Sequence, residues 1–546
     1  MFKGHPKGLI VAFFANMGER FGFYTMMGIL VFYLTAKYGL TESNAGVIYS
    51  VFYALIYGLA LVGGIIADRT MNYKGTIYVG LITMLGGYVL MTIPGFGLPF
   101  TLAALFVIAL GNGLFKGNLQ AVVGQLYDDP KYSHLRDSAF SVFYMGINIG
   151  ALFAPSVAAG IINWFIKSEG YTRNNELPAL IHRYQLDQLA DVTPLQTLAT
   201  EVSSFEVGVD QLSEFSTNYL AAYSAGFNYA FGAAAVTMVV SFIIFAIFKS
   251  KLPDIKKKVV KEGEKVIEMS KAETKQRLTA LFLVFGVVIF FWMAFHQNGL
   301  TMSFFARDYT ETSVGPGTNL IFNIWSLLSI VIGVFGISSF INKKSSIKSR
   351  IIGAFVALIS AGAVYYFYST NDPVNPISPE IFQHFNPTMI VLLTPIIVGF
   401  FAWLNKRNME PSAPRKIGIG MIIAAIGFVI LMVGSFGLDA FKDLMPDSPR
   451  VSVYWLISTY FTLTIAELFL SPMGISFVSK VSPPKYQGLM QGGWLMATAL
   501  GNQMLWVGSY FYERIAIWQV WAIFIVFSIL AAAFIFSMMK KLEKVS

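Results

Sequence analysis

GLIVAFFANMGERFGFYTMMGILVFYL, residues 8–34, is long and apolar enough to cross a membrane, yet Glu19 and Arg20 stand side by side near its middle. A membrane-spanning helix needs about 20 mostly apolar residues. A charge at mid-bilayer costs roughly 2.5–3.5 kcal/mol on insertion scales, so such residues usually face a water-filled path or a partner charge. The stretch therefore predicts a transmembrane helix beside a polar cavity. In a protein with many such helices, a polar cavity indicates transport.

The composition of the whole chain is typical of proteins that cross a membrane many times. Hydrophobic residues make up 55% of the 546 residues and charged residues only 13%, whereas a soluble domain contains about 25% charged residues. The mean hydropathy is +0.61. The chain has no cysteine, which excludes disulfides and thiolate metal sites. The net charge of +9 fits basic loops beside an anionic lipid leaflet better than contact with nucleic acid.

Fourteen apolar stretches are long enough to be transmembrane helices. Strands of a membrane barrel need only about 10 residues of alternating polarity, so the lengths favour helices. The fourteen stretches lie at about 8–37, 44–67, 75–95, 99–126, 138–166, 221–248, 279–306, 318–341, 350–369, 386–404, 416–437, 452–478, 488–511 and 515–538. The sequence therefore predicts an all-α membrane protein with about fourteen transmembrane helices.

Basic residues gather in loops that fall on one side of a protein with these spans. They include Lys256, Lys257, Lys258, Lys343, Lys344, Lys348, Arg350, Lys406, Arg407, Arg415, Lys416, Lys540, Lys541 and Lys544. Cytoplasmic loops are enriched in Lys and Arg. We therefore expect both termini to be cytoplasmic and the polar segment 168–220 to form an insertion on the other side. The expected location is the cell membrane, with a bacterial inner membrane as the leading interpretation.

The basic segment also divides the chain. Residues 1–250 are expected to form a six-helix bundle with the insertion, 251–275 a basic cytoplasmic linker, and 276–546 a second bundle. The second bundle contains an extra helix pair at about 318–369 that carries no charge within its spans. Two similar bundles predict a substrate site between them, near the membrane midplane.

Seven short motifs occur in order along these spans. They are ERFGFY (19–24), GGIIADRTMNYKGT (63–76), GNGLFKGN (111–118), FYMGINIGA (143–151), FNP (385–387), AELFLSP (466–472) and GGWLMATALGN (492–502). The second motif resembles the loop between helices 2 and 3 of the major facilitator superfamily. Together the other six motifs resemble the proton-dependent oligopeptide transporter family, and they cover both bundles. The resemblance implies the facilitator fold, with two six-helix bundles plus the inserted pair.

Three charged residues within the spans suit a zwitterionic peptide. Arg20 offers a planar fork that matches a carboxylate, and Lys116 is a second cation within a span. The resemblance implies that both hold the carboxyl end of a peptide and that Glu467 takes its amino group. The alternative is an ion pair between Lys116 and Glu467 that only locks the bundles. The two interpretations are compatible, since an ion pair that substrate breaks is itself a gate.

The resemblance assigns further residues to the binding site. Asn148 and Asn386 match amides that bond the peptide backbone, although a helix–helix hydrogen bond worth about 0.6 kcal/mol is the alternative. Tyr24 and Tyr57 match cavity tyrosines. Trp494 and Thr498 lie one helical turn apart and are candidates for a side-chain pocket.

A second group of residues is assigned to gating. The charged residues Asp68, Arg69 and Lys74 match a latch that gates the inner side. The alternative is an ordinary basic turn.

Several positions depart from the family pattern. Asn16 replaces an acid three residues before Glu19, Met27 replaces a base of helix 1, and His296 replaces an acid of helix 7. The family's helix-1 base and helix-7 acid pair across the outer gate, so this gate must close differently here. Gly117 replaces a proline after Lys116 and is expected to alter only the helix shape.

The same departures limit the candidates for proton coupling. Asn16 cannot titrate, so the remaining carriers are Glu19, Glu467 and His296, whose imidazole can titrate at physiological pH. The alternative for His296 is a neutral side chain that makes hydrogen bonds near the outer mouth.

We expect a proton-coupled symporter that imports di- and tripeptides by alternating access, with membrane lipid as its other partner. One alternative is a facilitator of the same fold for another small anion or a drug, with altered or absent proton coupling. The other is a membrane binding or assembly protein that transports nothing. The chain lacks HExxH, GxSxG and a P-loop ending in GK[ST], so no enzyme activity, cofactor or metal site is expected.

Overall fold

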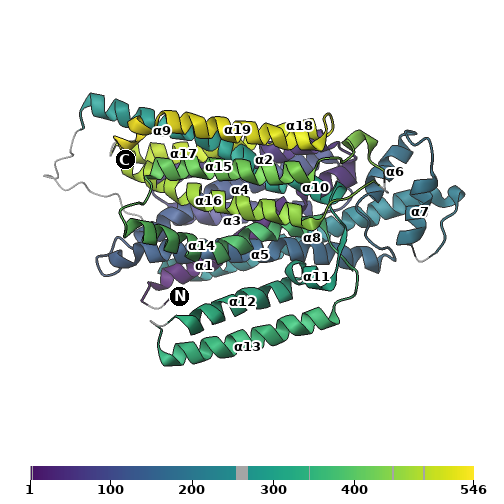
Figure 1. The fold of residues 1–546 in the computed structure, drawn as a ribbon, viewed down its shortest axis with the longest axis horizontal. Coiled ribbons are helices and arrows are strands. Elements are labelled where there is room, and N and C mark those ends of the chain that lie inside the picture. The colour runs from purple at the N-terminus through teal and green to yellow at the C-terminus, as the bar shows by residue number, and fades with distance from the viewer. Residues whose placement is uncertain are drawn as a thin grey trace.

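The computed structural model describes residues 2, 4–203, 205–253, 269–342, 345–445, 448–483 and 486–545, without the side chains of Asp137, Ser138, Gln487 and Gly488. Most of the predicted basic linker, with Lys256, Lys257 and Lys258, lies outside these residues, as do Lys343 and Lys344. The described chain is almost entirely helical, and its long helices run roughly along one axis of the molecule (Figure 1).

The first bundle consists of six long helices. They are α1 (Lys7–Tyr38), α2 (Glu42–Thr70), α3 (Tyr73–Met91), α4 (Leu98–Gln125), α5 (Arg136–Ser168) and α8 (Leu212–Phe248). Helix α1 packs against α5 and α8, while α3 and α2 both pack against α4. Glycines allow this packing: a Cβ atom on Gly63 of α2 would lie 2.1 Å from the carbonyl oxygen of Gly113 of α4. Small residues let membrane helices approach this closely.

The second bundle is built from longer and shorter pieces. They are α9 (Lys271–Phe295), α10 (Thr301–Asp308), α14 (Phe385–Asn405), α15 (Ala413–Gly434), α16 (Val453–Val481), α17 (Gln487–Gln503), α18 (Trp506–Tyr512), α19 (Ile517–Ser537) and α20 (Met539–Glu543). Helix α15 packs against α16 and α19, and α17 packs against α9. The bundles meet where α2 contacts α17 and α18, and where α5 contacts α14 and the 3₁₀ turn η5 (Pro379–His384).

Among the described residues, twelve helices are long and apolar enough to cross a membrane. The other two of the fourteen predicted spans are α1, which carries Glu19 and Arg20, and the pair α17–α18, in which α17 has only 17 residues. The predicted span 279–306 is also broken, because the 3₁₀ turn η4 (His296–Gly299) separates α9 from α10. Likewise, Asn323 divides the span 318–341, because its extended backbone ends α11 (Pro316–Phe322) and its side chain caps α12 (Ile324–Ile341).

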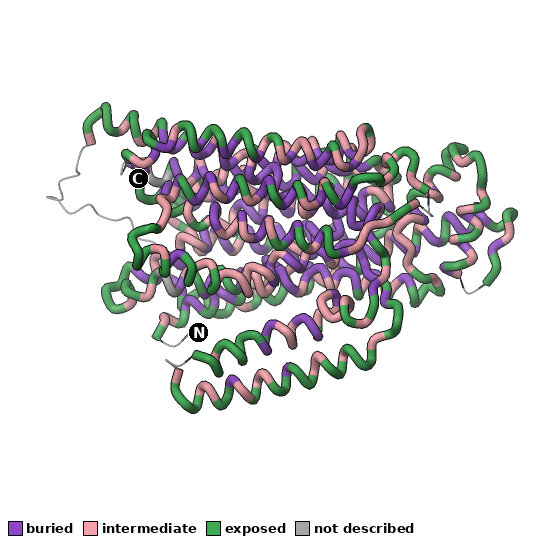
Figure 2. Tube along the Cα trace, viewed as in Figure 1, coloured by how far each residue is buried: buried purple, intermediate pink, exposed green. Residues whose placement is uncertain are grey.

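The extra helix pair forms a hairpin along one side of the molecule (Figure 1). Helices α12 and α13 (Ile347–Thr370) pack against each other, and α11 packs against both. Their backbones touch at two glycines: a Cβ atom on Gly353 would lie 2.7 Å from the carbonyl oxygen of Gly336. In α13 only Gly353 and Ser360 are buried, and Figure 2 shows the mostly exposed surface of this helix. The strands β1 (Ser313–Val314) and β2 (Asn375–Pro376) flank the segment that contains α11, α12 and α13, and they pair antiparallel where this segment begins and ends.

The segment between α5 and α8 forms two short helices, α6 (Leu177–Gln185) and α7 (Thr193–Val202), at one end of the molecule. Both chain termini lie at the opposite end (Figure 1). We call these the insertion end and the terminal end. With nine and ten residues, α6 and α7 are too short to cross a membrane.

Candidate functional site

Glu19 and Arg20 form a bidentate ion pair inside the first bundle. Arg20 Nε lies 2.6 Å from Glu19 Oε2, and Nη2 lies 2.5 Å from Oε1. The side chains are only 3% and 1% exposed. Asn112 of α4 donates a further hydrogen bond to Glu19 Oε1 at 2.6 Å, and the guanidinium lies 4.4 Å from the Phe23 ring centre. The arginine is therefore already bound to a carboxylate in this conformation.

Lys116, Tyr24 and Tyr57 lie within the spans, yet the side chain of each keeps part of its surface exposed. Lys116 places its Nζ 3.9 Å from the centre of the Tyr57 ring, a cation–π contact. Tyr24 follows Arg20 by about one turn of α1, and Tyr57 belongs to α2. Partial exposure of charged and phenolic groups so far inside a helical bundle indicates a polar cavity between the bundles.

Glu467 of α16 is held by an amide. Asn386 of α14 donates from Nδ2 to Glu467 Oε2 at 2.9 Å and to Thr464 Oγ1 at 3.1 Å. Within the described residues no ion pair joins Glu467 to Lys116, so the interbundle lock between these two side chains is not formed in this conformation. The acid and the two cations therefore remain on opposite bundles, with no direct bond between them.

The other predicted binding residues, Asn148, Trp494 and Thr498, make contacts within their own helix or with a neighbouring helix. Asn148 donates to the carbonyl oxygen of Tyr144 in its own helix, at 3.2 Å. Trp494 is buried against α16, where a Cβ atom on Gly474 would lie 1.9 Å from its ring. Thr498 is buried as well and donates to the carbonyl oxygen of Trp494 at 3.1 Å. Trp494 thus forms part of the packing between α17 and α16, and Thr498 is buried one turn further along α17.

His296 lies at the interface of the two bundles. Its ring is 4.6 Å from the Tyr53 ring of α2 and 4.6 Å from the Trp292 ring of α9. Its Nδ1 is 2.5 Å from Oδ1 of Asn502, so the nitrogen donates and the carboxamide oxygen accepts. The nearby motif had pointed to this region, but the sequence alone did not identify Asn502 as the partner.

The predicted gating residues lie at the terminal end. Lys74 donates to the carbonyl oxygen of Leu252, just beyond α8, at 3.2 Å. Asp68 accepts a hydrogen bond from the Tyr73 hydroxyl, and Arg69 is exposed. The start of α3 is thereby attached to the chain just beyond the last helix of the first bundle.

Ion pairs at the insertion end were not found by sequence reasoning. Arg307 Nη2 of α10 lies 2.6 Å from Glu42 Oε1 of α2. Arg173 pairs with Glu380 and Arg450 pairs with Glu176, again between the two halves of the chain. These residues lie near the ends of spans or in loops, and the only signal in the sequence was the charge itself.

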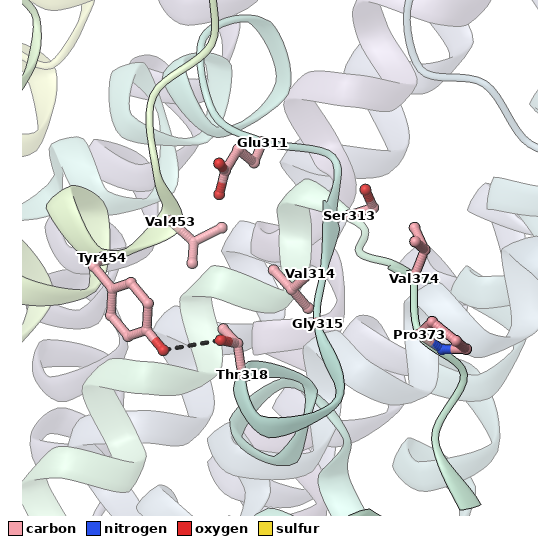
Figure 3. Close-up of a pocket in the computed structure, with 9 residues that line it drawn as sticks. All are labelled: Glu311, Ser313, Val314, Gly315, Thr318, Pro373, Val374, Val453 and Tyr454. Atoms are coloured by element: carbon pink, nitrogen blue, oxygen red, sulfur yellow. Dashed lines mark hydrogen bonds between the residues drawn. The ribbon is translucent and has the colours of Figure 1, made fainter.

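A small surface pocket of about 230 Å³ lies beside β1 and the start of α16. Figure 3 shows Thr318 and Tyr454, whose hydroxyls are 2.9 Å apart, and the carboxylate of Glu311 at its rim. None of the predicted binding residues lines it. The pocket is therefore separate from the charged cluster between the bundles.

Comparison with known proteins supports the same family. The model of the POT family matches residues 74–184 and 369–517, which include Lys116, Asn148, Asn386, Glu467, Trp494 and Thr498. The chain is 26% identical over 510 residues to the dipeptide and tripeptide permease A of Chromobacterium violaceum, covering 92% of this chain and 85% of the relative. It is 26% identical over 525 residues to the di-/tripeptide transporter of Lactococcus lactis subsp. lactis, covering 91% and 87%.

Solved structures share the fold. The crystal structure of a peptide transporter POT in complex with sulfate superposes with a TM-score of 0.68 at 20% identity, over 100% of this chain and 96% of the other. A POT family transporter in complex with 5-aminolevulinic acid gives a TM-score of 0.68 at 19% identity, over 99% and 98%. The all-α fold predicted from the sequence is therefore confirmed as the fold of these transporters.

Proposed function

Since this chain belongs to the POT family of membrane transporters, we propose that it imports di- and tripeptides by alternating access, driven by protons. Relatives that match nine-tenths of the chain carry the names of di- and tripeptide transporters. The observation that carries the proposal is the placement of the cations Arg20 and Lys116 on the first bundle and of the acid Glu467, held by Asn386, on the second. A peptide with charged ends fits between a cation on one bundle and an acid on the other.

The roles follow from the chemistry of each side chain. Arg20 binds the peptide carboxylate through its planar fork, and Lys116 adds a second positive charge. Glu467 binds the peptide ammonium. Asn386, which holds Glu467 in this conformation, and Asn148, which bonds to its own helix, turn their amides to the peptide backbone when peptide binds. Such contacts do not depend on side-chain identity, which suits a transporter of many peptides.

Tyr24 and Tyr57 complete the polar wall of the cavity. Trp494 and Thr498 shape the space for peptide side chains from behind, through the packing of α17 on α16.

The Glu19–Arg20 pair offers a route for coupling. Nε and Nη2, which form one of the two forks that Arg20 can present to a peptide carboxylate, are bound to Glu19. A proton on Glu19 removes its charge and releases the fork, and the incoming carboxylate then restores the balance of charge. Peptide and proton therefore bind together. Glu467 and His296 are the further candidate carriers, and the bond from His296 Nδ1 to Asn502 can form with the imidazole neutral or protonated.

Membership of this transporter family also suggests how the chain is arranged in the membrane. Residues 1–250 and 276–546 form the two moving bundles, and 251–275 links them on the cytoplasmic side. The insertion end faces outward and the terminal end inward, in the cell membrane, with a bacterial inner membrane as the expected one. At the inner side, Asp68, Arg69 and Lys74 act as the latch. Lipid surrounds the bundles and the extra helix pair.

Uptake of a labelled dipeptide into proteoliposomes, with and without an inward proton gradient, tests the proposal. Accumulation only with the gradient supports proton-coupled peptide import. Equal uptake without the gradient, or uptake of another anion or a drug in place of peptide, would favour the facilitator without proton coupling. No uptake of any solute would leave a membrane binding or assembly protein.

A further inference from the structure

We propose that the segment between α5 and α8, residues 169–211 of the predicted insertion 168–220, clamps the two bundles together at the insertion end, through Arg173 with Glu380 and Glu176 with Arg450. In alternating access this end must open, so both ion pairs must break in every cycle. The inference rests on the proposed function for its role in transport. The clamp itself is a property of the conformation and can be measured without any substrate.

The stronger of the two contacts is fully enclosed. Arg173 Nη1 lies 2.6 Å from Glu380 Oε1, and Nη2 lies 3.2 Å from Oε2, with the side chains only 5% and 0% exposed. Nη1 also donates to Asn163 of α5 at 3.3 Å. A bidentate pair that is shielded from water holds its partners far better than an exposed one. Removing one member leaves the other as a buried charge without compensation.

The insertion is fixed to the first bundle. The Tyr219 hydroxyl of α8 accepts from the backbone N–H of Asn174 at 2.8 Å, and the Tyr223 hydroxyl donates to Asn175 at 2.8 Å. On α6, a ring nitrogen of His182 is 2.8 Å from the carbonyl oxygen of Ala36 near the end of α1. The segment that carries Arg173 and Glu176 must therefore move with the first bundle.

The partner residues belong to the second half of the chain. Glu380 lies in η5, which leads directly into α14. Arg450 lies just before α16, and its Nη1 donates to the carbonyl oxygens of Arg307 at 2.9 Å and Thr310 at 3.0 Å. Its Nη2 contacts Glu176. The two ion pairs consequently connect elements that separate when this end opens.

The clamp also accounts for the departures at the outer gate. Met27 is apolar and cannot form an ion pair, and His296 is bonded to Asn502. The direct pair Arg307–Glu42 closes the gap between α10 and α2, and the insertion adds two more pairs beside it. Closure at this end thus depends on ion pairs at other positions than Met27 and His296, where the family pattern has its base and its acid.

Spin-label distances across the insertion end test the clamp. The chain has no cysteine, so single cysteines at Phe96, in the loop after α3, and Lys442, in the loop before α16, can be labelled without other changes. In lipid nanodiscs without peptide, we expect Arg173→Ala to raise the ratio of long to short distances about tenfold or more, in line with the loss of a charged hydrogen bond. The matched control Lys167→Ala changes an exposed base beside the insertion and should leave the distances unchanged.

Two further variants keep the test decisive. Glu176→Gln weakens the more exposed pair and should produce a smaller shift, even if Arg173→Ala does not fold. Exchanging the charges, Arg173→Glu with Glu380→Arg, should restore the short distance. Distances in Arg173→Ala and Glu176→Gln that match the wild type would overturn the clamp. Peptide uptake by the same proteins is scored separately, so a failed clamp with normal uptake is distinct from a protein that carries no peptide.

Discussion

Replacing Arg20 with lysine tests the binding site most directly, because the charge is kept and only the geometry changes. In the structure Arg20 makes two hydrogen bonds to one carboxylate, at 2.6 and 2.5 Å. The single ammonium of lysine cannot reproduce this planar fork. If the peptide carboxylate is bound in the same way, the variant keeps one charged contact and loses the other.

The expected loss of peptide affinity follows from the loss of one of the two hydrogen bonds. A hydrogen bond to a charged group contributes about 1.5–3 kcal/mol, and about 1.4 kcal/mol corresponds to a tenfold change in affinity. Arg20→Lys should therefore weaken peptide binding about 10- to 150-fold. The variant should also lose discrimination, because a dipeptide whose carboxyl group is amidated never used the second bond.

The assay is competition by unlabelled peptides for uptake of a labelled dipeptide into proteoliposomes. Each dipeptide is compared with its C-terminal amide, in the wild type and in the variant. Arg183→Lys, at an exposed position of α6, is the matched control for an arginine-to-lysine change. Wild-type affinity in Arg20→Lys, with the preference for a free carboxyl group intact, would refute direct contact between Arg20 and the carboxylate.

Three further changes have clear expected outcomes. Glu467→Gln retains a partner for Asn386 but removes the charge proposed to bind the peptide ammonium, so uptake should fall sharply, and unchanged uptake by a normally expressed variant would exclude that role. Glu19→Gln should abolish accumulation against a gradient while downhill exchange persists, and continued proton-driven concentration of peptide would show that coupling lies elsewhere. Gly353→Leu should separate α12 from α13 and lower the melting temperature with little loss of uptake, whereas loss of uptake in a stable protein would give the pair a part in transport.

The helices were predictable because a membrane allows few alternatives. A chain that spans lipid must satisfy its own backbone hydrogen bonds, so each apolar run of about 20 residues becomes a helix. The interruptions were not predictable, because they depend on local caps and contacts. Asn323 divides a predicted span by capping α12, and the turn at His296–Gly299 divides another.

The charged cluster was partly predictable for a similar reason. Charges within the spans are expensive, so Arg20, Lys116 and Glu467 stood out against their apolar surroundings. Their partners did not, because pairing depends on how distant segments pack. Lys116 lies on the Tyr57 ring and not beside Glu467. Arg173 and Glu380 are 207 residues apart, both in segments where charges are ordinary.

The strands β1 and β2 have a consequence for how this chain tolerates change in length. Ser313 pairs with Pro376 and Val314 with Asn375, and the backbone N–H of Ile377 donates to the carbonyl oxygen of Thr312 at 2.8 Å. The chain thus leaves the second bundle and returns to it at the same point. One short turn would reconnect these ends if the segment between them were deleted, and the deletion would remove the contacts of Phe322 in α11 with Phe382 and Phe385. A shortened gene that joins these ends preserves the direction of every later helix.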